Sequence, residues 1–78
     1  MSNHGQAWLV QQLVGDGVLD FVDLYGSRED AISNALEEVV RAEERIGPPE
    51  ETHAERNTYH RWHWPGLYTV IIIQTTVQ

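Results

Sequence analysis

The densest group of chemically active side chains is the segment Tyr59–Trp64, which reads YHRWHW. It holds His60 and His63, and His53 stands a few residues earlier, so imidazole ligation of a metal is the first chemistry to consider. Residues three apart on a strand point to opposite faces, however, and no cysteine or carboxylate completes the usual spacing of ligands. We therefore expect neither a metal nor any other cofactor at this segment.

Aromatic rings interleaved with Arg61 could also stack the bases of a single-stranded nucleic acid. The charge balance opposes this function, because twelve Asp and Glu residues stand against five basic residues, all arginine, for a net charge of −7. A polyanion would be repelled, so we expect no direct nucleic-acid contact. The remaining interpretation is a pair of core tryptophans with an exposed edge that contacts a protein. That edge consists of Tyr59, Arg61, His63 and Tyr68.

Hydrolytic chemistry has little support in this sequence. The chain has no cysteine, no GxSxG motif and no HExxH motif, although it has four histidines and many carboxylates. We expect a protein that is not an enzyme. A small metal-dependent enzyme is the less favoured alternative, and metal-dependent thermal stabilisation would support it.

The rest of the chain is organised around one predicted helix, which runs from Ser27 to Gly47. Ser27 is suited to cap its first turn, Gly47 can adopt a left-handed conformation after the last turn, and Pro48 and Pro49 cannot continue a helix. A period of 3.6 residues gives the helix one apolar face for a core. That face consists of Ile32, Ala35, Leu36, Val39, Val40, Ala42 and Ile46.

The opposite face of the helix is acidic. Glu37, Glu38 and Glu44 fall on the side predicted to face water. We expect them to form one continuous negative surface, recognised by a basic protein, with the acidic residues of the following loop. Those loop residues are Glu50, Glu51 and Glu55. The alternative is a solvated face that serves only solubility.

Strand signals flank the helix on both sides. Residues 7–14 and 18–25 are separated by Gly-Asp-Gly and predict one hairpin, while residues 59–64 and 67–77 are separated by Pro65-Gly66 and predict another. Residues 48–58 are polar and proline-led, which is typical of an exposed loop. The sequence therefore predicts a single α+β domain over residues 1–78, one helix on a mainly antiparallel four-stranded sheet in the order β-β-α-β-β.

The last predicted strand indicates that one sheet face is left uncovered. Residues 70–73 are apolar on both faces, as in a central strand, but one helix about 10–12 Å wide cannot cover both faces of a sheet. We expect a homodimer or a protein partner there. Alternation assigns one face to His60, Trp62, Trp64, Leu67, Thr69, Ile71 and Ile73, and the other to Tyr59, Arg61, His63, Tyr68, Val70 and Ile72.

No apolar run approaches the roughly 18 residues of a membrane span, and the N-terminal residues MSNHGQ have no signal-peptide pattern. The sequence predicts a cytoplasmic protein with no membrane contact.

Two resemblances extend this interpretation. The segment FVDLYGSREDAISNALEEVV is similar to the strand-to-helix junction of HicB-type antitoxins, although the three leading strands of that family are missing. The chain as a whole, being small, acidic and free of cysteine, resembles phage-encoded anti-CRISPR proteins. The second resemblance implies a stoichiometric inhibitor that blocks a nucleic-acid-binding complex by contacting a basic protein subunit. The first implies an antitoxin-type or other small regulatory interaction protein.

Overall fold

The computed structural model describes residues 5–56 and 58–77, which form one helix and five strands. The elements are β1 (Gly5–Val14), β2 (Val18–Tyr25), α1 (Arg28–Ile46), β3 (Glu51–Glu55), β4 (Tyr59–Trp64) and β5 (Tyr68–Val77). All neighbouring strands are antiparallel, in the order β2-β1-β5-β4-β3. The α+β class is confirmed, whereas the predicted sheet of four strands is wrong.

The missed strand is β3, which lies inside the segment predicted to be a loop. Its sequence, ETHAE, has no apolar alternation, and all five residues are exposed. The strand pairs with β4 alone, from Glu51 opposite His63 to Glu55 opposite Tyr59. β3 is a strand only because it pairs with β4, and none of its side chains is buried. The sequence therefore has no apolar pattern from which β3 could be predicted.

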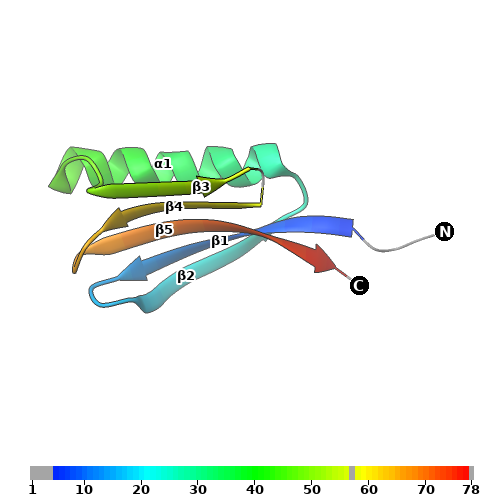
Figure 1. Cartoon of the computed structure of the whole chain (residues 1–78), viewed down its shortest axis with the longest axis horizontal. Coiled ribbons are helices and arrows are strands. Elements are labelled where there is room, and N and C mark those ends of the chain that lie inside the picture. The colour runs from blue at the N-terminus through cyan, green and yellow to red at the C-terminus, as the bar shows by residue number, and fades with distance from the viewer. Residues whose placement is uncertain (1–4, 57, 78) are drawn as a thin grey trace.

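The core lies between α1 and one face of the sheet, and Figure 1 shows the helix running along the strands on that side. Four helix residues are buried there: Ala31, Ala35, Val39 and Ala42. Three of them are alanines, so the helix backbone can lie close to bulky strand residues. Those are Val10, Val70, Ile72, Trp62 and Trp64. β5 is the central strand, as its two-sided apolar pattern predicted.

Both predicted helix ends are confirmed. The Ser27 Oγ accepts a hydrogen bond of 3.1 Å from the amide of Asp30, and Gly47 at φ +90° donates its amide to the Glu43 carbonyl over 3.0 Å. The buried stripe is narrower than predicted, because Leu36, Val40 and Ile46 are exposed. The bulky side chains of the strands contact α1 only along its stripe of small residues. The residues of α1 on either side of this stripe therefore remain exposed.

The turn between β4 and β5 changes which residues share a face. Gly66 has φ +73° and the Leu67 amide donates to the Trp64 carbonyl over 2.9 Å, which confirms the predicted type II turn. Leu67 is an additional loop residue, however, and pairing resumes with Trp64 opposite Tyr68. The predicted division of faces is therefore wrong: β5 is shifted by one residue, which places Tyr68, Val70 and Ile72 on the helix side.

Candidate functional site

One whole face of the sheet, here called the open face, is covered by no element of the described chain (Figure 1). Cross-strand pairing fixes its membership, because residues directly opposite each other share a face. One row runs from Leu24 through Leu9, Ile73 and Tyr59 to Glu55. The other members are Leu19, Val22, Gln11, Leu13, Thr69, Ile71, Arg61, His63, Glu51 and His53.

The open face has an apolar half and a polar half. The apolar half spans β2, β1 and β5, where most outward residues are Leu, Ile or Val and the polar exceptions include Gln11 and Thr69. Leu19, Val22 and Leu24 are exposed, and Leu9 and Ile71 are half-buried by their neighbours alone. Apolar side chains arranged this way resemble half of a packed interface rather than a solvated surface.

The polar half lies on β4 and β3 and centres on Arg61. The Arg61 Nη2 lies 3.5 Å from the Glu51 Oε1, a long contact, and the Arg61 Nε is buried without a partner among the described residues. His53 Nε2 lies 3.0 Å from Glu55 Oε2, and the His53 ring centroid is 5.8 Å from that of Tyr59. An arginine with unused donors beside an aromatic ring is the composition of an interaction hot spot.

Three of the four predicted edge residues come together. Tyr59, Arg61 and His63 share the open face, and the His63 Nδ1 lies 2.8 Å from the Thr69 Oγ1. Tyr68 lies on the opposite face under α1, because Leu67 belongs to the turn. The predicted contact edge therefore loses Tyr68.

The predicted acidic surface is divided among three places. Glu37 and Glu44 are exposed on the outer side of α1, whereas the Glu38 side chain is only 19% exposed and pairs with Arg41 over 2.9 Å. Glu51 and Glu55 lie on the open face, on the other side of the sheet. The continuous surface expected from the helical wheel is therefore wrong, because β3 carries its acids away from α1.

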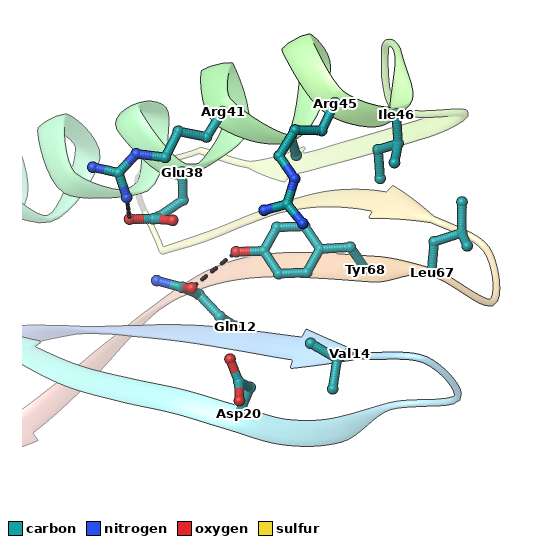
Figure 2. Close-up of a pocket in the computed structure, with 10 residues that line it drawn as sticks. Gln12, Val14, Asp20, Glu38, Arg41, Arg45, Ile46, Leu67 and Tyr68 are labelled. Carbon is teal, nitrogen blue, oxygen red and sulfur yellow. Dashed lines mark hydrogen bonds and ion pairs between the residues drawn. The ribbon is translucent and has the colours of Figure 1, made fainter.

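A cleft of about 430 Å³ lies between α1 and the strands β1, β2 and β5 (Figure 2). At its floor the Tyr68 hydroxyl donates to the Gln12 Oε1 over 2.9 Å. Burial, and then the charges of Glu38 and Asp20, raise the pKa of Tyr68 to about 12. The hydroxyl is therefore neutral and acts as a fixed donor at ordinary pH. The lining contains no serine, histidine or cysteine that could act as a nucleophile or base.

The histidines of β4 diverge as their spacing predicted. His60 lies on the helix side, with its ring stacked on Trp62 at a centroid distance of 3.8 Å, whereas His63 is on the open face. Burial, and then the charges of Arg28 and His53, lower the pKa of His60. Within residues 5–56 and 58–77, no three His, Asp or Glu side chains are grouped closely enough to hold a metal.

The sequence predicts an uncovered sheet face at residues 70–73, but not the apolar residues that β1 and β2 add to it. The signal was present in AWLVQQLV, where Leu9, Gln11 and Leu13 alternate with residues of the core.

No family model, curated protein or solved structure matches this chain. The helix of the described chain is too polar to cross a membrane.

Proposed function

We propose that this protein is a small, non-enzymatic binding module that contacts a protein partner through its open face. The observation that carries the proposal is the apolar half of that face, which the described chain leaves uncovered. Contiguous exposed apolar side chains rimmed by polar ones mark interaction sites in soluble proteins. Arg61 and Tyr59 beside this patch supply residue types that are enriched in binding hot spots.

The partner class is argued from charge. The chain carries −7 overall, and the exposed Glu37 and Glu44 lie on the outer side of α1. A net charge of this sign acts on approach from any side, including the open face, and favours a basic protein. More specifically, we propose that the protein is an inhibitor, similar to anti-CRISPR proteins, that blocks a nucleic-acid-binding complex by protein–protein contact. An antitoxin-type regulator is the second candidate, and it rests on the helix-entrance segment alone.

Capture of the partner from lysate with a matched pair of variants tests the proposal. Ile71→Lys places a charge at the middle of the open face, where the amine can still reach water. Val40→Lys makes the same change on the exposed flank of α1 and serves as the control. We expect the wild type and Val40→Lys to retain the partner stoichiometrically and Ile71→Lys to lose it. If folded Ile71→Lys retains the partner, the open face is not the contact.

The identity of the captured protein, read by mass spectrometry, separates the two function classes. A subunit of a nucleic-acid-binding complex supports the inhibitor, and a small toxin supports the antitoxin. Double reversal by Glu37→Lys and Glu44→Lys should slow association at low salt. This difference should fade as the Debye length shortens from about 10 Å at 0.1 M to about 3 Å at 1 M salt. An unchanged association rate would remove the electrostatic part of the proposal.

A further inference from the structure

The two edges of the sheet are built in opposite ways. β3 is five residues long and carries two exposed glutamates, Glu51 and Glu55, which discourage another strand from pairing there. β2 is eight residues long and contains no lysine, proline or glycine. Five of its residues are large, apolar and exposed: Val18 at 65%, Leu19 at 52%, Phe21 at 46%, Val22 at 44% and Leu24 at 53%.

The apolar residues of β2 lie on both faces of the strand. Val22 and Leu24 are on the open face, whereas Phe21 is on the helix side, opposite Gln12. Apolar side chains on both faces are typical of strands that are covered on both faces, whereas these side chains are exposed in the single chain. β2 is an edge strand, and its Leu24 amide points away from β1 and donates to the Asp23 Oδ1 of its own strand over 2.9 Å, a bond that a second strand would have to replace.

We propose that β2 pairs antiparallel with β2 of a second copy of this chain, about a two-fold axis at Asp23. The axis stands perpendicular to the sheet, so both helices lie on one side of a continuous ten-stranded sheet. A two-fold axis lets the same strand supply both partners of an isologous interface. The two open faces then join into one larger surface, which goes beyond the binding function proposed above.

The register follows from side-chain matching. With Asp23 on the axis, Val22 lies opposite the partner's Leu24 on the open face, and Phe21 lies opposite the partner's Tyr25 on the helix side. Both kinds of pair are apolar or aromatic, and such cross-strand pairs stabilise a sheet. All residues from 21 to 25 are in regular pairing with β1.

The neighbouring registers are poorer. An axis at Val22 places Leu24 opposite the partner's Asp20, and an axis at Phe21 places Leu19 opposite the partner's Asp23. Both also extend across the irregularity in β2, where the pairing of Gln12 and Leu13 shifts by one residue. A bulge increases local twist and interrupts a ladder, so a second strand would not follow β2 there.

The chosen register has one cost and one geometric consequence. The two Asp23 carboxylates face each other, and like charges directly opposite are destabilising. Because the Leu24 amide points outward, the Asp23 amide points toward β1, and the two Asp23 residues form a non-hydrogen-bonded pair. In such pairs the Cα atoms lie about 4.5 Å apart, within the range of a disulfide.

Disulfide trapping tests the register directly, because the chain has no cysteine of its own. Asp23→Cys should oxidise to a symmetric covalent dimer at least about tenfold faster than Asp16→Cys, which lies in the exposed turn before β2 and reports random collision. Equal rates would overturn the proposed pairing, whatever the mass of the wild type in solution.

Sedimentation velocity of the wild type should show a concentration-dependent species of twice the 8.9 kDa chain mass. Phe21→Lys changes the edge without touching the open face, and should weaken the dimer more than about tenfold because it occurs twice. Asp23→Asn should tighten the dimer roughly two- to fivefold by removing the facing charges. A wild type that stays monomeric, or a Phe21→Lys variant that dimerises equally, overturns the inference. Phe21→Lys tests the β2 dimer, whereas Ile71→Lys tests the contact with the partner, so each proposal can fail without the other.

Discussion

Replacing Tyr68 by Phe removes a single oxygen from the floor of the cleft. That hydroxyl donates to the Gln12 Oε1 over 2.9 Å, and the Gln12 side chain is buried. The ring keeps its place, because its contact with Trp64, at a centroid distance of 5.7 Å, involves no hydroxyl. The variant therefore isolates one hydrogen bond between β1 and β5.

The expected loss follows from how well water can replace the hydroxyl. A neutral hydrogen bond contributes about 0.5–1.5 kcal/mol, and a buried acceptor left without a partner costs up to about 3 kcal/mol. The cleft of about 430 Å³ admits water to the Gln12 carbonyl, so the penalty for an unpaired acceptor is largely avoided. We expect a loss of about 1 kcal/mol in the free energy of unfolding, or about 4–8 °C in Tm for a chain of this size.

Tyr68 also makes a specific contribution to alkaline unfolding. Burial raises its pKa to about 12 in the folded protein, from about 10 in the unfolded chain. Between these values the unfolded state loses a proton that the folded state keeps, so stability falls as pH rises from 10 to 12. Two pKa units correspond to about 2.7 kcal/mol in full, and screening by water in the open cleft reduces this to about 1 kcal/mol. Tyr68→Phe should remove that part of the slope.

Urea unfolding of four proteins measures the hydrogen bond: the wild type, Tyr68→Phe, Gln12→Met and the double variant. The coupling energy should be about 0.5–1.5 kcal/mol at pH 7, with the slope m unchanged. Repeating the series at pH 11 should show a smaller difference between the wild type and Tyr68→Phe, because the wild type has lost stability there. Additive single losses at pH 7 would contradict the proposed hydrogen bond, and a difference that grows with pH would contradict the raised pKa.

Three further predictions concern the helix and its contacts. Ser27→Ala should cost about 1 kcal/mol in thermal unfolding through loss of the cap, whereas Ser33→Ala on the exposed side of α1 should cost nothing measurable. Ala35→Leu should cost about 1–3 kcal/mol in urea, because Ala35 is fully buried and α1 would be forced away from the sheet. The lowered pKa of His60 means that the folded state resists protonation, so stability should fall as pH drops below about 6.5. His60→Phe, which can still stack on Trp62, should flatten that fall in a series of melts from pH 7 to 5.

The elements predicted correctly carry their signals in neighbouring residues. The limits of α1 depend on Ser27 and Gly47, which act within one turn, and the first hairpin depends on its Gly-Asp-Gly turn. These interactions are local, so a single sequence is enough to locate them. β3 has no comparable signal, because its order comes from pairing with β4.

The candidate site could be predicted only in part, because the phase predicted for β5 is wrong by one residue. Moving Leu67 from the strand into the turn transfers every β5 side chain to the other face, so Tyr68 leaves the predicted contact edge and Ile71 joins the open face. The cleft could not be predicted, since it joins Gln12, Tyr68 and Arg45 from three elements. The strand order that brings these elements together is a property of the whole chain.

The placement of β1 and β5 side by side at the middle of the sheet also bears on how the protein is made. On the ribosome, β1 is the first strand of the described chain to emerge and β5 is the last, yet each needs the other as its neighbour. Until β5 is released, the nascent hairpin of β1 and β2 has unpaired backbone on both edges, and α1 has no complete surface to cover. Folding of the sheet therefore has to wait for β5 and for closure of a long loop, which slows it relative to helical proteins of similar size. During that interval exposed apolar strands favour aggregation, and the net charge of −7 opposes it.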